Sequence, residues 1–166
     1  MNQSEATLLI GIGKKVDGGV VEIRPGSSSY HLIPLDAQYK DHRFLLDIRQ
    51  SSIAINKITS QQRVHTSIVL SRLDIDGARH TNPQYDPATI PGGLDMGLHN
   101  LLQRYDCHRY ERGVAHLHIY IEGFDERWAF PPEEFGIIHR GGQAEIVRSF
   151  CERFNISPPR IRSSLI

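Results

Sequence analysis

The segment His116–Gly123, with the sequence HLHIYIEG, decides how we interpret the fold. Its polar and apolar side chains alternate strictly, and a period of two residues indicates a β-strand with one buried face. The apolar residues 117, 119 and 121 form that buried face, and the opposite face carries His116, His118, Tyr120 and Glu122. Imidazole, phenol and carboxylate groups can transfer protons or bind a metal, so this polar face is where we look for function.

Composition and charge restrict the class of protein. The 166 residues suit one domain, and 39% hydrophobic with 23% charged residues is typical of a soluble globular protein. Nineteen basic and nineteen acidic residues give a formal net charge of zero, which argues against a strongly electrostatic nucleic-acid-binding protein. The N-terminus lacks a signal-peptide pattern and no apolar run could span a membrane, so we expect a cytoplasmic protein with free Cys107 and Cys151.

Helical patterns lie near both ends of the chain and strand patterns lie between them. We predict a short helix over Glu5–Lys14, capped by Ser4, and a second helix over Gly142–Phe154 with an apolar stripe at helical spacing. Strands are predicted over residues 20–23, 30–34, 43–48, 53–58, 64–75, 114–122 and 127–130. Residues 78–97, rich in Pro and Gly, form a long loop. The chain is therefore expected to be one α+β domain over residues 1–166, built on a bent antiparallel sheet.

A second strand is expected to add polar side chains to the histidine face. Arg72 and Asp74 alternate with apolar residues at 73 and 75, and buried faces must coincide if this strand pairs with the histidine strand. Polar residues that follow either strand in the sequence complete the candidate set. The expected catalytic residues are His116, His118, Arg72, His80 and Tyr120, and the expected binding residues are Asp74, Asn82, Glu122, Asp125 and Trp128.

Two chemistries suit this set of side chains. Paired histidines can act as general acid and base while an arginine stabilises the charge of a phosphoryl transition state, which describes a phosphodiesterase or ribonuclease that needs no metal or cofactor. Alternatively, His116, His118, His80 and a carboxylate could bind Zn²⁺ or Mn²⁺, although no Cys-x-x-Cys or His-Glu-x-x-His motif accompanies them. A structural interpretation is also open, in which Arg72 and Asp74 form an ion pair across the strands and the aromatic residues only pack.

The polar residues also form a pattern that resembles a known family. The pattern is Arg72-Leu73-Asp74, Gly77, His80-x-Asn82-Pro83, His116-x-His118-Ile119-Tyr120-x-Glu122-Gly123 and Trp128-Ala129. It resembles an uncharacterised domain family of bacteria, prophages and phages, with similarity from Phe44 to the last helix and a longer segment inserted at about Tyr85–Gly113.

The resemblance implies a role on a mobile element, and three functions remain open. The first is an enzyme that acts on RNA or a nucleotide through His116 and His118. The second is a phage-encoded inhibitor of a host defence system, which binds a protein partner through the loop over Pro83–Gly97 and has no catalytic activity. The third is a small metal-binding protein. None of the three requires a membrane.

Overall fold

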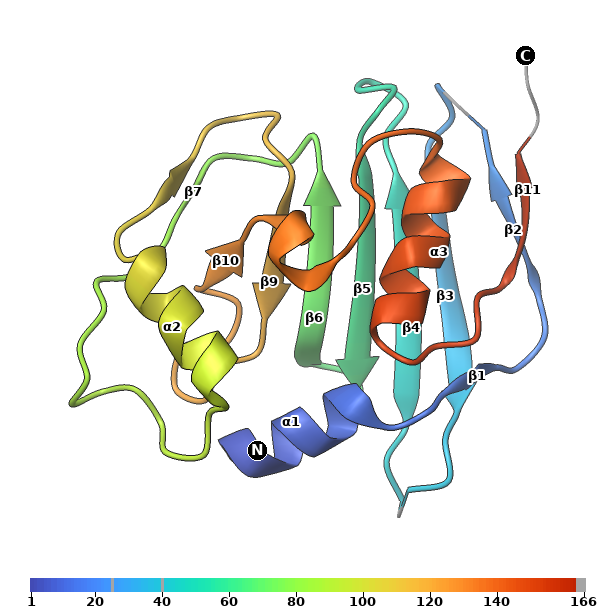
Figure 1. Ribbon diagram of the computed structural model, residues 1–166. Coiled ribbons are helices and arrows are strands. Elements are labelled where there is room, and N and C mark those ends of the chain that lie inside the picture. Colours follow the sequence, from blue (N-terminus) through green and yellow to red (C-terminus); the bar gives the residue numbers. More distant parts are fainter. Residues whose placement is uncertain (25, 40, 164–166) are drawn as a thin grey trace.

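A computed structural model describes residues 1–24, 26–39 and 41–163, and its centre is a seven-stranded sheet (Figure 1). Every strand pairing in this sheet is antiparallel. In spatial order the strands are β1 (Lys15–Val16), β3 (Ser29–Asp36), β4 (Phe44–Gln50), β5 (Ile58–Val64), β6 (Ile68–Ile75), β9 (His116–Ile119) and β10 (Ala129–Phe130). Alternating apolar side chains give this sheet a buried face and a polar face.

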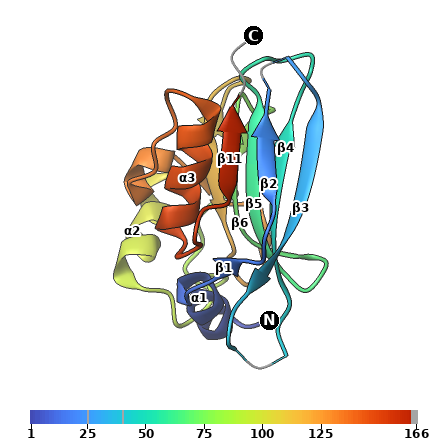
Figure 2. The same cartoon turned by 90° about the vertical axis from the view of Figure 1, so that its right-hand side faces the viewer.

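The helices lie together on one side of the large sheet, as Figure 2 shows. They are α1 (Gln3–Gly11), α2 (Met96–Arg104), the 3₁₀ helix η1 (Pro132–Phe135) and α3 (Gln143–Arg153). The core fills the space between these helices and the sheet, and includes Phe44, Leu46 and Ile48 of β4 with Phe150 of α3, all fully buried. Burying each such side chain stabilises the fold by about 1.5–3 kcal/mol. None of the described helices is long and apolar enough to cross a membrane.

Two small sheets flank the large one. Strand β2 (Val20–Ile23) pairs in parallel with β11 (Arg160–Ser163). Strand β7 (His80–Thr81) pairs antiparallel with β8 (Arg109–Tyr110). Strand β7 lies within the long loop predicted over residues 78–97, and β8 lies beyond it. The ribbon that they form contacts the histidines of β9, as described below.

The predicted α+β fold, with an antiparallel sheet and a helix near each end, is confirmed. The C-terminal helix α3 falls within one residue of its predicted bounds, and the strand predicted over residues 20–23 is β2. The N-terminal helix begins at Gln3, earlier than predicted. Its capping residue is Asn2 rather than Ser4, because the Asn2 side chain accepts a hydrogen bond from Glu5 N at 2.8 Å. This helix ends at Gly11 rather than Lys14.

Two strand predictions were wrong. Residues 53–57 form an irregular connection between β4 and β5, where Ile53 is 95% exposed and has no apolar surface to pack against. The single bent strand predicted over residues 64–75 is instead the end of β5, a tight turn and β6. The turn depends on His65, whose φ of 55° lies in the left-handed region and reverses the chain.

Candidate functional site

The candidate site is built on two rows of residues that cross the sheet on the face opposite the helices. Asp74 of β6 lies opposite His116 of β9, and Arg72 lies opposite His118. The sequence predicted that these two strands would share a polar face if they paired, and it left their register open. Since directly opposite residues share a face and lie about 5 Å apart, the strand register alone brings these four side chains together.

The two histidines are covered by the β7–β8 ribbon. His80 of β7 places its ring centroid 5.7 Å from that of His116 and 4.8 Å from that of His118. Tyr110 of β8 lies 5.2 Å from His116 by the same measure. As a result His116 and His118 are only 3% and 2% exposed, although they belong to the polar face of the sheet. Their rings therefore lie in a protein environment of low polarity rather than in water.

Asp74 is the centre of the cluster. Its Oδ2 atom lies 3.6 Å from His118 Nε2 and 3.9 Å from His116 Nε2. One possible ligand atom from each of the three residues falls within 4.8 Å of the others. Two donors fix the carboxylate, because Thr59 Oγ1 donates to Oδ1 at 2.7 Å and Arg72 Nε donates to Oδ2 at 2.8 Å. The three groups thus converge on a single point.

Hydrogen bonding determines which nitrogen of each imidazole is available. His116 Nδ1 lies 2.9 Å from the carbonyl oxygen of Val114, and a carbonyl can only accept, so Nδ1 carries the hydrogen. In the neutral ring the lone pair is then on Nε2, the nitrogen near Asp74. Neither ring nitrogen of His118 has a hydrogen-bond partner among the described residues. Both imidazoles can therefore offer a nitrogen lone pair beside the carboxylate.

Electrostatics favour the neutral form of His118 and the ionised form of Asp74. Burial, together with the nearby Arg72 charge, lowers the pKa of His118 far below its usual value. Burial alone would raise the pKa of Asp74, but the Arg72 charge and the Thr59 hydrogen bond outweigh it and lower that pKa. A neutral imidazole and a carboxylate are the protonation states in which these side chains bind metal ions.

Arg72 is already paired with two acidic side chains. Besides its bond to Asp74, its Nη1 atom donates to Glu126, in the turn that follows β9. The two carboxylates compensate the guanidinium charge. Arg72 therefore fixes the position of Asp74 and closes the site against the turn, rather than presenting a free positive charge.

His80 and Asn82 connect the segment that follows β6 to the backbone at the start of β10. His80 Nε2 lies 3.0 Å from the carbonyl oxygen of Arg127 and 3.1 Å from Asn82 Oδ1, so this nitrogen is the protonated one. Burial lowers the pKa of His80. The Asn82 amide in turn bonds both backbone groups of Ala129 in β10, at 2.9 and 2.8 Å. His80 forms a wall of the site, whereas Asn82 has a structural position.

Four of the predicted site residues do not join the cluster, because β9 ends at Ile119 and the chain then turns. The Tyr120 hydroxyl donates to the Met1 carbonyl at 2.7 Å, and the Glu122 carboxylate accepts from Gln3 N at 2.8 Å. Trp128 is fully buried and stacks on Phe130, while Asp125 lies in the turn with a φ of 48°. The expectation that one polar row continues to Glu122 was therefore wrong.

Sequence reasoning missed three residues that shape the site. Thr59 and Glu126 hold Asp74 and Arg72, and Gly77 lets the chain pass the imidazole of His116. A Cβ atom at Gly77 would lie 2.8 Å from His116 Cε1. The alternation of Thr59, Gln61 and Arg63 with buried residues could have placed Thr59 on this face. Gly77 is part of the pattern shared with the resembling family, but nothing in the sequence indicated its role, and no local pattern identifies Glu126.

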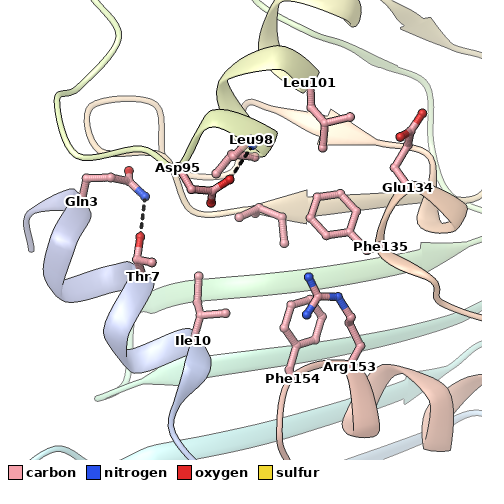
Figure 3. A pocket seen from close by; sticks show the side chains of 12 residues that line it. Gln3, Thr7, Ile10, Asp95, Leu98, Leu101, Glu134, Phe135, Arg153 and Phe154 are labelled. Carbon is pink, nitrogen blue, oxygen red and sulfur yellow. Dashed lines mark hydrogen bonds between the residues drawn. The ribbon is translucent and has the colours of Figure 1, made fainter.

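Hollows border the sheet on both of its faces. On the polar face, Arg72 and Asp74 help to line a hollow of about 280 Å³, so the cluster borders open surface through these two side chains and not through its histidines. On the helical side, α1, α2, η1 and α3 meet around a hollow of about 240 Å³, whose lining side chains are drawn in Figure 3. Polar groups around the second hollow bond one another, such as Gln3 with Thr7 and Asp95 with Leu98 N. The polar-face hollow is the one associated with the cluster.

Comparison with known proteins supplies the family of this chain. No curated protein and no solved structure matches it. A family model matches residues 1–156, which include every strand of the large sheet and all of the cluster described above. This agrees with the resemblance to an uncharacterised domain family. The chain belongs to the family of unknown function DUF6978.

Proposed function

We propose that this protein binds a divalent transition-metal ion through Asp74, His116 and His118. The observation that carries the proposal is His118, whose imidazole is 2% exposed, has two nitrogens without hydrogen-bond partners among the described residues, and lies 3.6 Å from Asp74 Oδ2. Leaving a buried polar group unpaired costs about 1–3 kcal/mol. A bond from Nε2 to a metal ion would remove that cost for one of the two nitrogens.

The spacing of the three groups supports tetrahedral coordination. Bonds of about 2.1 Å in a tetrahedral zinc site place the ligand atoms about 3.4 Å apart. The two nitrogen–oxygen separations here are 3.6 and 3.9 Å, and the three possible ligand atoms all lie within 4.8 Å of one another, so the side chains would have to close by up to about 1.4 Å. The hydrogen bonds from His116 to the Val114 carbonyl and from Thr59 to Asp74 are of the kind that orient metal ligands.

The ligand set identifies the class of ion. Two imidazoles and one carboxylate suit Zn²⁺ or Fe²⁺, and the tetrahedral spacing favours Zn²⁺. Three protein ligands would leave one position for water or a substrate, which is the arrangement of catalytic rather than structural zinc sites. The hollow that Asp74 lines gives such a ligand a route to the ion.

Two observations favour this function over the metal-independent phosphodiesterase expected from the sequence. The lowered pKa of His118 makes it a poor proton donor near neutral pH, and Arg72 is paired with Asp74 and Glu126. The cofactor-free mechanism expected from the sequence thus loses one member of its histidine pair and the free charge of Arg72. The mobile-element origin, the cytoplasmic location and the inhibitor of host defence stay predictions from the sequence.

Metal analysis of the purified protein tests the proposal. We expect about one equivalent of bound metal after incubation with Zn²⁺ and gel filtration, and intense visible absorption bands from tetrahedral Co²⁺. The variants His118→Ala and Asp74→Asn should lose both signals. His99→Ala, which changes a histidine that bonds Tyr85 outside the cluster, should keep them. A wild-type protein that retains no Zn²⁺, Fe²⁺ or Co²⁺ would contradict the proposal.

A further inference from the structure

The polar-face hollow extends from Asp74 across the neighbouring strands β5 and β4. Arg49 of β4 lies opposite Thr59 of β5, which lies opposite Asp74 of β6, and Asp74 lies opposite His116. Arg49 is therefore two strands away from Asp74, a separation of about 10 Å between backbones. Both residues line the hollow, together with Lys57. A small group in the hollow could contact Arg49 and the proposed metal at once.

The charges that line this hollow do not cancel. Its two carboxylates already have arginine partners: Arg63 bonds Asp47 through two nitrogens, and Arg72 bonds Asp74. Arg49 and Lys57 have no carboxylate partner within the described part of the chain, and Arg49 instead lies over the Tyr30 ring at 4.7 Å. On a chain of zero net charge, this leaves a local excess of positive charge beside the metal ligands.

The positive surface extends beyond the first hollow. A neighbouring hollow of about 730 Å³ shares Lys57, Gly77 and Ala78 with it. It adds Arg79 and Arg112 and one carboxylate, that of Asp76, so its cations still outnumber its acidic groups. Arg79 pairs with Glu111 at 3.2 Å, whereas Arg112 has no carboxylate partner among the residues described. The two hollows therefore form one groove, in which cations without acidic partners are spaced along the surface that leads to Asp74.

We infer that this groove binds a phosphate-bearing substrate, with a phosphate held by Arg49 and Lys57 next to the metal ion. Guanidinium and ammonium groups are the side chains that bind phosphate oxygens most strongly, and a divalent ion adds a further positive contact. The inference rests on the proposed function for the contribution of the ion, but the two cations are independent of it. A nucleotide and a nucleic-acid strand share this phosphate chemistry, and the experiment separates them.

Binding measurements with three probes test the inference. Calorimetric titrations would use inorganic phosphate, uridine 5′-monophosphate and hexauridylate, each with zinc-loaded and with metal-free protein. We expect the double variant Arg49→Gln/Lys57→Gln to weaken binding of at least one probe tenfold or more while it retains its metal. The matched control is Arg160→Gln/Arg162→Gln, which removes the same charge from exposed positions of β11 and should bind like wild type. Circular dichroism verifies that each variant is folded.

Each outcome has a defined meaning. Tighter binding of hexauridylate than of the monophosphate identifies a strand as the ligand, and equal binding identifies a single phosphate group. Failure of all three probes to bind the zinc-loaded protein overturns the inference and leaves the metal site intact. Equal loss of affinity in the double variant and in the control also overturns it, because bulk charge would then explain binding. Binding that depends on Arg49 and Lys57 but is equally tight in zinc-loaded and metal-free protein supports the groove and overturns the contribution of the ion, whereas the proposed function is tested separately by metal retention.

Discussion

Gly77 controls how closely the chain that leaves β6 can approach His116. An added Cβ atom would lie 2.8 Å from His116 Cε1 and 3.2 Å from Asp74 Cβ, so the imidazole would have to move. We predict that Gly77→Ala destabilises the protein by about 1–3 kcal/mol, as overpacking does. We also expect it to weaken Zn²⁺ binding by about 10-fold or more, as displaced ligand geometry does. Urea unfolding and competition with a zinc indicator measure the two effects.

Gly92 provides the control for this substitution. No atom lies within 4 Å of a Cβ built at Gly92, so Gly92→Ala should leave stability and zinc affinity close to those of wild type. Equal zinc affinity in both variants would show that the position of His116 does not determine metal binding.

The buried Lys14 side chain should make the free energy of unfolding depend on pH, and this effect does not involve the metal site. Burial lowers its pKa to about 8, while its Nζ atom donates to the carbonyl oxygens of Ile10, Ile12 and Phe154. The unfolded chain keeps this proton up to about pH 10.4, so between pH 8 and that value the unfolded state binds more protons. The free energy of unfolding should therefore rise with pH in this window, relative to that of Lys14→Met.

Urea denaturation of both proteins at pH 7.5, 9 and 10 measures this difference. Subtracting the variant removes the contributions of tyrosines and cysteines, which titrate in the same range. A difference between wild type and variant that stays constant from pH 7.5 to pH 10 would show that Lys14 has an ordinary pKa in the folded protein.

At the scale of elements, the connection after β9 holds the N-terminal helix to the sheet. Gln3 and Glu122 bond reciprocally at 2.8 and 2.9 Å, and the Tyr120 hydroxyl bonds the Met1 carbonyl. We predict that Tyr120→Phe lowers the stability of α1 by about 1 kcal/mol, the usual effect of one lost hydrogen bond. Hydrogen exchange should become faster at the α1 amides, while zinc affinity is unchanged.

Tyr30→Phe removes a hydroxyl that bonds Asp47 on the polar face of the sheet, and is the matched control. It should leave exchange at α1 as in wild type. If Tyr120→Phe reduced zinc affinity without affecting α1, Tyr120 would belong to the functional site after all.

The success of the sequence predictions varied with the element. Strict alternation around His118 and Arg72 determined which side chains share a face, because buried faces must coincide when two strands pair. The alternation continued past Ile119, yet the strand did not, since Tyr120 and Glu122 bond the N-terminal helix. That helix is distant in sequence, so no local pattern could show the contact. The turn at His65 was missed for a different reason: the segment over residues 65–67 contains neither glycine nor proline, the strongest sequence signals of a turn.

At the scale of the whole molecule, the proposed ion would link β6 to β9. A ligand that binds only the folded state at 100 times its dissociation constant stabilises that state by about 2.7 kcal/mol. For a chain of this size we expect Zn²⁺ to raise the thermal midpoint by about 5–10 °C, and a chelator to reverse the change. Differential scanning calorimetry measures it. The variant Asp74→Asn should show no zinc-dependent change, and an equal increase in that variant would indicate non-specific binding.

Only part of the site could be predicted from the sequence. Strand pairing placed Asp74, His116 and His118 together, and all three were candidates. Their burial could not be anticipated, because it depends on the β7–β8 ribbon, whose two-residue strands give no periodic pattern. That burial leaves His118 without hydrogen-bond partners and changes the favoured function from acid–base catalysis to metal binding.

Anomalous X-ray scattering at the zinc absorption edge, from crystals grown with one equivalent of Zn²⁺, tests the central claim most directly. We predict a single strong peak about 2.1 Å from Nε2 of His116, Nε2 of His118 and an oxygen of Asp74. Data collected below the edge should lose the peak. A zinc peak elsewhere on the protein, or none within bonding distance of these three residues, would contradict the account.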